Sequence, residues 1–355
     1  MAFGAQYYKH TLNFRFDAGT SRGVLRKKDS YFLKIFQKDQ PDVFGIGEAG
    51  PLKGLSIDYG EIAERKIKEI VELVNLSSGN IDFEGLINTL ERFPSVRFAL
   101  ETALFDFQNN GKREIFKNSF FENQQPIAIN GLVWMGSKEF MQQQIKEKID
   151  AGFDTIKLKI AALNFEEELS IIKNLRKEFS SSQITLRLDA NGGFSKTDAL
   201  EKLKRLSDFH IHSIEQPIEA NQVDEITFLC QKSPIPIVLD EELINPTLEK
   251  IELLEIIKPH YIILKPSLMG GIRGSREWIN IAEKNNIKWW ITSALESNIG
   301  LNAICQFAAE YPDNRLPQGL GTGQLYSNNF DSPLKVENGQ ISYIKELDWN
   351  LDYFN

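Results

Sequence analysis

The chain has 355 residues, 42% of them hydrophobic, and a formal net charge of −8 from 41 Lys and Arg against 49 Asp and Glu. This length can hold one large core or two unequal ones, since a barrel of alternating strands and helices takes about 250 residues. The basic residues form no run long enough to bind a nucleic-acid backbone, so we expect no nucleic-acid partner. The sequence shows no leader pattern and no apolar stretch of about 18 residues, so we expect a cytoplasmic protein with no membrane partner.

The first part of the chain predicts a small α+β domain. Between residues 6 and 50, β-branched and aromatic residues alternate with polar ones, which indicates three antiparallel strands. Apolar residues at three- and four-residue spacing then predict helices over 59–76, 82–93 and 95–111, with Asp82 and Ser95 as N-caps. We assign residues 1–120 to this capping domain and expect residues 325–355 to return to it.

The rest of the chain alternates between strands and helices. Apolar runs predict eight strands, at residues 127–133, 155–159, 184–189, 211–215, 235–240, 261–265, 288–293 and 316–321. Seven clear helices connect them, the first over residues 138–151. The fold class is therefore α/β, a (β/α)7β TIM-like barrel over residues 121–324 with an N-terminal α+β capping domain.

Five of these strands end in a charged residue, in the order Lys159, Asp189, Glu215, Asp240 and Lys265. The last four lie 26, 25 and 25 residues apart, which is close to one strand, one helix and two loops. Active sites of such barrels lie at the carboxyl ends of the strands. Because side chains alternate faces along a strand, Lys157 shares the inward face with Lys159, and Arg187 shares it with Asp189.

The three carboxylates predict a metal site. Asp189, Glu215 and Asp240 come from adjacent strands, where their mutual repulsion is costly unless a cation lies among them. Oxygen ligands without Cys or His favour Mg²⁺, with Mn²⁺ as the alternative, and leave room for a substrate carboxylate. Each residue alone would more often be a solvated strand end; the regular spacing and shared face favour a site.

The two flanking lysines predict acid–base chemistry. Lys159 and Lys265 would approach a small carboxylate substrate from opposite sides, and a nearby cation in a partly dry pocket would disfavour their ammonium forms. We expect Lys157 to favour the neutral form of Lys159 by repulsion. A metal-bound carboxylate has an acidic α-proton, so the reaction is expected to begin with its removal by a lysine.

At these positions the chain resembles the muconate-lactonizing-enzyme branch of the enolase superfamily, in which Mg²⁺ paired with a lysine base is a known pattern. The shared motifs are KLK at 157–159, DAN at 189–191, EQP at 215–217, DEE at 240–242 and KPS at 265–267. Further stretches resemble members that dehydrate a succinylated cyclohexadiene: GTSRGVL at 19–25, GIGEAGPLKGLS at 45–56, SALESNIGLNAI at 293–304 and PQGLGTGQL at 317–325.

The resemblance implies syn dehydration of 2-succinyl-6-hydroxy-2,4-cyclohexadiene-1-carboxylate to 2-succinylbenzoate, a step of menaquinone biosynthesis. Lys159 would take the α-proton and return a proton to the leaving hydroxyl, while Lys265 would stabilise the enediolate from the other side. Asn191 and Gln216 would orient the groups that bind the metal, although an Asx turn also explains Asn191. Arg187 lies two residues before Asp189 on the same strand face; it is either a counter-charge for the site or part of a buried structural pair.

Substrate identity is expected to depend on loops of the cap and on the end of the seventh strand. The candidate substrate-binding residues are Thr20, Ser21, Arg22, Gly23, Ser293 and Ser297, together with the loop at 50–55. Glycines there allow close backbone approach or loop movement, and ordinary turn chemistry explains them equally well.

Two other functions remain compatible with the sequence. An N-acylamino acid racemase or dipeptide epimerase begins with the same proton abstraction and also needs both lysines. A non-catalytic barrel that binds an anionic metabolite would tolerate loss of a ligand or a base, whereas all five positions are filled here. The sequence carries no signal of oligomeric state.

Overall fold

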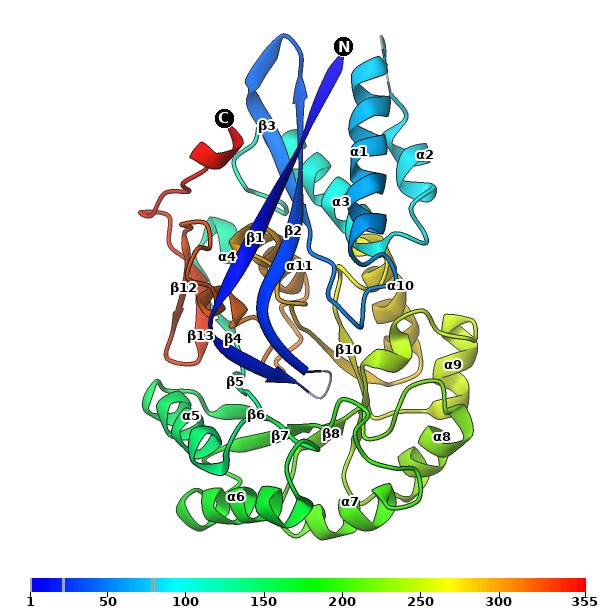
Figure 1. Cartoon of the computed structure of the whole chain (residues 1–355), viewed down its shortest axis with the longest axis vertical. Coiled ribbons are helices and arrows are strands. Elements are labelled where there is room, and N and C mark those ends of the chain that lie inside the picture. The colour runs from blue at the N-terminus through cyan, green and yellow to red at the C-terminus, as the bar shows by residue number, and fades with distance from the viewer. Residues whose placement is uncertain (1, 21–22, 78, 80) are drawn as a thin grey trace.

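The computed structural model describes residues 2–20, 23–77, 79 and 81–355. The molecule has two parts, one above the other in Figure 1: a sheet with helices at the top, where both termini lie, and a barrel below. None of the described helices is long and apolar enough to cross a membrane.

The upper part is the predicted capping domain. Its antiparallel sheet has the order β1-β2-β3, with β1 at Phe3–Thr20, β2 at Gly23–Gln37 and β3 at Gln40–Ala49. The helices are α1 (Glu61–Leu76), α2 (Phe83–Asn88) and α3 (Pro94–Gln108). Helix α3 packs closely on β3 because two glycines leave room for it: a Cβ on Gly45 or Gly47 would lie 1.9 Å from a carbonyl oxygen of α3.

Two predicted helix starts have different outcomes. The side chain of Asp82 accepts a hydrogen bond from Gly85 N (2.9 Å), so this N-cap is confirmed. The N-cap at Ser95 is wrong, because α3 begins one residue earlier, at Pro94, where the fixed φ of proline suits a first helical position. The Ser95 hydroxyl instead donates to Asp58 (2.7 Å) in the loop between β3 and α1.

The lower part is a barrel of parallel strands surrounded by helices. The sheet has the order β11-β10-β9-β8-β7-β6-β5, with strands at Gly131–Val133, Thr155–Lys159, Thr185–Asp189, Ser213–Glu215, Ile237–Leu239, Tyr261–Leu264 and Lys288–Ile291 for β5 to β11. The surrounding helices are α4 (Ser119–Glu122), α5 (Lys138–Asp150), α6 (Phe165–Glu178), α7 (Ala199–Ser207), α8 (Val223–Lys232), α9 (Lys250–Ile257), α10 (Gly271–Lys284) and α11 (Asn298–Ala309).

The eighth predicted strand closes the barrel through a few backbone contacts and is not a regular strand. Gly319 bridges in parallel to Thr292, just after β11, and Gln318 bridges to Ile129, just before β5. Apolar residues at alternate strand positions, such as Ile156 and Leu158 on β6, pack outward against the helices. The charged residues between them therefore point inward, as strand parity predicts.

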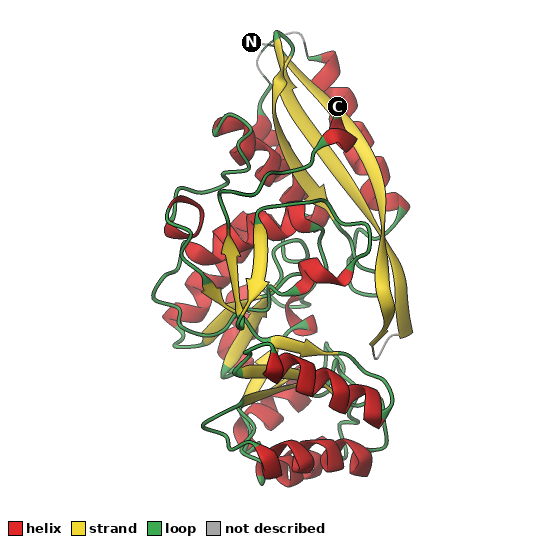
Figure 2. Ribbon diagram, turned by 90° about the vertical axis from the view of Figure 1, so that its left-hand side faces the viewer, coloured by secondary structure: helices red, strands yellow, loops and turns green. Residues whose placement is uncertain are grey.

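The C-terminal residues contact both parts of the molecule. The hairpin of β12 (Leu334–Glu337) and β13 (Gln340–Tyr343) pairs with β4 (Ile127–Ala128), which divides the predicted first barrel strand into β4 and β5. Phe354 then packs against Phe32 in the first sheet, and its carbonyl accepts hydrogen bonds from Tyr8 (2.9 Å) and Lys34 (2.8 Å). Figure 2 shows this end of the chain lying along the strands of the upper sheet.

A buried carboxylate joins the cap to a barrel helix. Glu101 on α3 accepts a hydrogen bond from Ile272 N (2.6 Å) in the first turn of α10, and Arg97 lies 3.5 Å from its other oxygen. Burial raises the pKa of Glu101 from its ordinary 4.5 to about 7, although the charge of Arg97 opposes this rise. The folded protein therefore binds a proton here over a pH range in which the unfolded chain has released it.

This pKa predicts a pH effect on stability. The favourable contribution of the protonated Glu101 is complete below about pH 4.5 and is lost as the pH rises through 7, by up to about 3 kcal/mol. Glu101→Gln cannot ionise, so its free energy of unfolding should rise relative to wild type between pH 5 and pH 8. Urea unfolding of both proteins at several pH values measures this difference; a difference that does not change with pH would contradict the assignment.

Candidate active site

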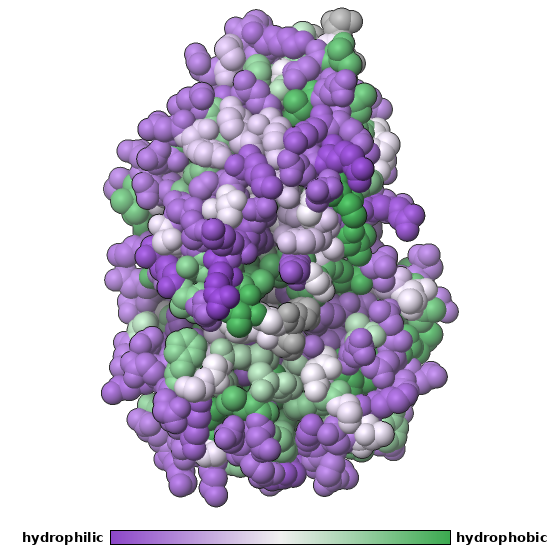
Figure 3. Space-filling view, in the orientation of Figure 1, coloured by the Kyte–Doolittle hydropathy of each residue, from purple (hydrophilic) through white to green (hydrophobic). Residues whose placement is uncertain are grey.

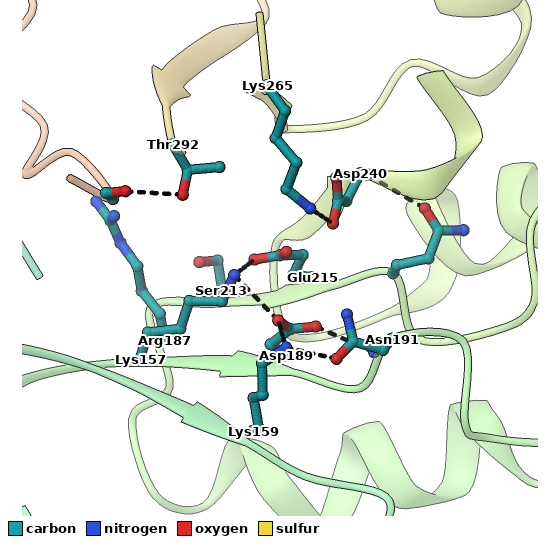
Figure 4. A network of polar contacts seen from close by, with 12 residues as sticks. Lys157, Lys159, Arg187, Asp189, Asn191, Ser213, Glu215, Asp240, Lys265 and Thr292 are labelled. Carbon is teal, nitrogen blue, oxygen red and sulfur yellow. Dashed lines mark hydrogen bonds and ion pairs between the residues drawn. The ribbon is translucent and has the colours of Figure 1, made fainter. Parts of the chain in front are cut away.

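The register of the sheet brings the predicted charged residues together. Lys159 lies beside Asp189, and Asp189 beside Glu215, on neighbouring strands β6, β7 and β8. Glu215 pairs with Val238, so Asp240 projects from the same face two residues further along the chain. The side chains are nearly completely buried, and Figure 4 shows Lys159 and Lys265 reaching the carboxylates from opposite sides.

Lysine ammonium groups compensate the three negative charges. Lys159 Nζ lies 2.9 Å from Asp189, and Lys265 Nζ contacts Asp240. Lys157 Nζ lies between two carboxylates, 3.0 Å from Asp189 and 2.5 Å from Glu215. Lys157 is therefore the counter-charge of the central pair, and its expected effect on Lys159 stays a prediction.

The close approach of the carboxylates changes the pKa values of the groups in the site. Burial and the neighbouring charge of Asp189 raise the pKa of Glu215 well above its ordinary value. Burial is the largest single influence and lowers the pKa of Lys265, but the negative charges of Asp240, Glu241 and Glu215 together raise it by more, so that it lies above its ordinary value. A cation among the carboxylates would oppose both effects, because it stabilises the ionised acid and repels the ammonium group.

The donor set suits such a cation. Glu215 Oε1 and Asp240 Oδ1 are buried and have no hydrogen-bond partner among the described residues, and both are hard oxygen atoms of the kind that Mg²⁺ binds. Within the same described ranges no group of three or more His, Cys, Asp or Glu side chains has the complete geometry of a metal site. The carboxylates would therefore turn from their lysine partners to bind a metal.

Two amides hold this arrangement in place. Asn191 Oδ1 accepts a hydrogen bond from Lys159 Nζ (2.6 Å), and its amide donates to Glu241 (3.1 Å). Gln216 Oε1 accepts from the backbone N–H of Asp240 (3.2 Å). Both residues have positive φ, 44° for Asn191 and 37° for Gln216, which is uncommon for residues other than glycine and often accompanies a functional site.

Arg187 contacts the closing segment of the barrel. Its guanidinium donates to Pro317 O (2.7 Å) and lies 4.0 Å from the ring centroid of Trp290. Burial lowers the pKa of Arg187 to about 10, and the charge of Glu215 opposes that change. The geometry fits the structural alternative, in which Arg187 stabilises the barrel below the carboxylates.

A cavity of about 500 Å³ opens beside the lysines, between the cap and the barrel mouth. Lys159, Lys265 and Asn191 lie at its polar end. Its other walls are largely apolar, and Phe16 and Trp134 meet edge to face there with ring centroids 6.0 Å apart. In Figure 3 green side chains gather near the middle of the molecule, where the cap meets the barrel. Cavities of this size and character bind small molecules.

The predicted substrate-binding residues lie in different places. Thr20, Gly23 and Ser293 line the cavity. Ser21 and Arg22 fall outside the described residues. Ser297 is not part of the lining: it is the N-cap of α11, and its hydroxyl donates to Glu48 of the cap (2.5 Å).

Part of the cavity lining carries no signal in the sequence: Phe16 and Trp134 form apolar walls, and Lys148 also lines the cavity. The predicted loop at 50–55 does contribute Lys53, and the predicted end of the seventh strand contributes Leu295. Apolar residues in strands and loops give no sequence signal that separates a cavity wall from a core. Leu295 does have a structural signal, because its φ of 63° is rare for a bulky residue.

Comparisons with known proteins show which family the chain resembles. The family model described as enolase C-terminal domain-like matches residues 140–346. The chain is 42% identical to an o-succinylbenzoate synthase of Desulfotalea psychrophila, over 94% of this chain and 97% of that protein. The crystal structure of MenC from Desulfotalea psychrophila LSv54 superposes with a TM-score of 0.86 at 38% identity, covering 96% of this chain and all of that one.

A more distant relative has a different activity in its name. The chain is 23% identical to an L-Ala-D/L-Glu epimerase of Bacillus subtilis, over 84% of this chain and 81% of that protein.

Proposed function

The chain belongs to the enolase superfamily, and we propose that it catalyses the reaction of an o-succinylbenzoate synthase, the dehydration of 2-succinyl-6-hydroxy-2,4-cyclohexadiene-1-carboxylate to 2-succinylbenzoate. It is a carbon–oxygen lyase that acts on a small carboxylate. The 42% identity to a synthase over nearly the whole of both chains supports this reaction more strongly than the 23% identity to an epimerase.

One observation carries the mechanism: two buried lysines face three buried carboxylates from opposite sides, at the polar end of the cavity. A substrate carboxylate at that end places the neighbouring α-carbon between Lys159 and Lys265. Lys159 Nζ then removes the α-proton, and its contact with Asn191 fixes the direction of the amine. The resulting negative charge on the substrate carboxylate is stabilised by the ammonium group of Lys265 from the other side.

The second half of the reaction uses the same lysine. The proton on Lys159 passes to the hydroxyl group on the same face of the ring, the C–O bond breaks, and water leaves as the ring becomes aromatic. Abstraction and return of the proton by one side chain give syn elimination. Lys157, held between Asp189 and Glu215, keeps the carboxylates in position during both steps.

Asp189, Glu215 and Asp240 would hold the divalent cation, which we propose is Mg²⁺, with Mn²⁺ as a substitute. When bound, the cation supplies positive charge that makes the α-proton more acidic. The unpartnered oxygens of Glu215 and Asp240 support this assignment. We place the reaction in menaquinone biosynthesis, as the sequence resemblance implies, and in the cytoplasm, as expected from the sequence.

The proposal predicts a direct assay. Purified protein with Mg²⁺ and the cyclohexadiene substrate should cause a rapid fall in the ultraviolet absorbance of the diene, and a chelator should stop it. Mass spectrometry of the mixture should show 2-succinylbenzoate. No loss of substrate, together with α-proton exchange on dipeptides or N-succinyl amino acids in heavy water, would assign the site to an epimerase or a racemase.

A further inference from the structure

A buried polar cluster connects the cap to one wall of the cavity. It comprises Lys28, Ser30 and Glu48 of the cap together with Ser267, Glu296 and Ser297 of the barrel, each at most 5% exposed. None of these side chains lines the cavity. The reaction described above uses none of them, yet an ionisable cluster this deeply buried is costly unless each group is satisfied by hydrogen bonds.

Glu48 is the centre of the cluster. Its Oε1 accepts hydrogen bonds from the Ser30 hydroxyl (2.6 Å) and Ser297 N (2.9 Å). Its Oε2 accepts from the Ser297 hydroxyl (2.5 Å) and Gly300 N (3.0 Å). Three of these donors belong to the N-terminal end of α11, where a negative charge is favourable. A side chain of the cap therefore fixes the start of a barrel helix.

The loop before that helix carries the cavity wall. Leu295 lines the cavity with a φ of 63°, a conformation that costs energy for a branched residue and persists only when its surroundings enforce it. Tyr326 donates its hydroxyl to Leu295 O (2.7 Å). On either side, Ala294 N donates to Glu296 (2.7 Å), and Ser297 is held by Glu48.

The same cluster reaches the loop of the second lysine. The hydroxyl of Ser267, two residues after Lys265, donates to Glu296. Glu296 and Glu48 both lie against Gly300, where a Cβ would be 2.8 Å from the Glu296 side chain and 2.9 Å from Glu48 Oε2. The cap, the Leu295 wall and the loop after Lys265 are thus parts of one hydrogen-bonded unit.

We infer that Glu48 is a positioning residue for substrate binding: through Ser297 and Gly300 it holds Leu295 against the succinyl-bearing side of the substrate. This inference rests on the proposed function and adds the residue that sets the shape of its binding cavity. Leu295 touches a part of the substrate that does not react. Displacing Leu295 therefore weakens the binding of the substrate and of the transition state equally, which raises KM and leaves kcat nearly unchanged.

Glu48→Gln tests this with little change in size. In wild type each carboxylate oxygen of Glu48 accepts a hydrogen bond from a backbone N–H. In either orientation of the glutamine amide, its NH₂ group faces one of these N–H groups, and because both are donors the loop must shift. We expect KM to rise about tenfold and kcat to stay within about twofold, because a contact that is lost equally from the substrate and the transition state raises KM alone. Glu101→Gln is the matched control: it is also a buried cap glutamate that binds a barrel helix N-terminus, but its partner Ile272 does not line the cavity.

A double-mutant cycle separates positioning from general loss of stability. In a Leu295→Ala background the effect of Glu48→Gln on KM should disappear, because the wall that Glu48 positions is already gone. Tyr326→Phe removes another support of Leu295 and should also raise KM, which keeps the test valid if Glu48→Gln does not fold. A wild-type KM in both Glu48→Gln and Tyr326→Phe, an equal effect of Glu101→Gln, or additive effects in the cycle would overturn the inference. An inactive wild type would instead overturn the proposed function.

Discussion

Lys159→Ala is expected to lower kcat for the dehydration by about 10²- to 10⁴-fold, the range for loss of a positioned general base. Lys159 is the lysine that Asn191 orients at the polar end of the cavity. Lys157 cannot replace it, because its ammonium group is held between Asp189 and Glu215. Stopped-flow or steady-state absorbance measurements of diene loss give the ratio directly.

The control for this variant is Lys196→Ala. Lys196 lies on the surface, where its side chain is 56% exposed and pairs with Glu225, so its removal should leave turnover unchanged. Product binding by Lys159→Ala, measured by calorimetry, shows whether the cavity remains intact. Near wild-type turnover by a folded Lys159→Ala would mean that another group removes the α-proton.

Asp240→Asn is expected to weaken Mg²⁺ binding and turnover by more than about 100-fold, because changes to groups that merely support a metal ligand already cost 10- to 100-fold. The substitution removes the charge that faces Lys265 and leaves one side-chain oxygen where the carboxylate has two. High Mg²⁺ concentrations should restore part of the activity, since the other two carboxylates remain. Mg²⁺ titrations of turnover and calorimetry measure both effects.

Asp39→Asn is the matched control for the metal ligand. Asp39 is exposed in the turn between β2 and β3, so the same substitution there should not change the Mg²⁺ dependence. An unchanged apparent affinity for Mg²⁺ in Asp240→Asn would show that the cation does not bind this carboxylate.

Strand parity and spacing predicted which charged side chains lie together at the ends of the barrel strands. In parallel strands the register fixes which side chains are neighbours, so Lys159, Asp189 and Glu215 follow one another around the barrel once their strands are recognised. The boundary errors have structural causes. The eighth strand makes only isolated bridges near Gln318 and Gly319, and the β4–β13 pairing depends on a hairpin more than 200 residues away in the chain.

The contacts between the two domains could not be predicted in the same way. Glu48 and Ser297 are 249 residues apart, and neither has a neighbour in sequence that indicates the other. The strand itself does carry a signal. Glu48 lies two residues after Ile46 and therefore on the same face of β3, and both side chains are buried. A buried carboxylate at this position needs hydrogen-bond partners from another part of the chain. Because the sequence does not indicate that partner, it predicts a substrate-binding role for Ser297, whereas the structure places Ser297 in the contact between cap and barrel.

The most direct test of the site is a crystal structure with Mn²⁺ and 2-succinylbenzoate, with anomalous scattering recorded to locate the metal. We expect one Mn²⁺ bound by Asp189, Glu215 and Asp240 and by the ring carboxylate of the product, with Lys159 and Lys265 on opposite faces of the ring and the succinyl group beside Leu295. A metal bound by other residues, or a product ring with both lysines on one face, would contradict the proposed mechanism.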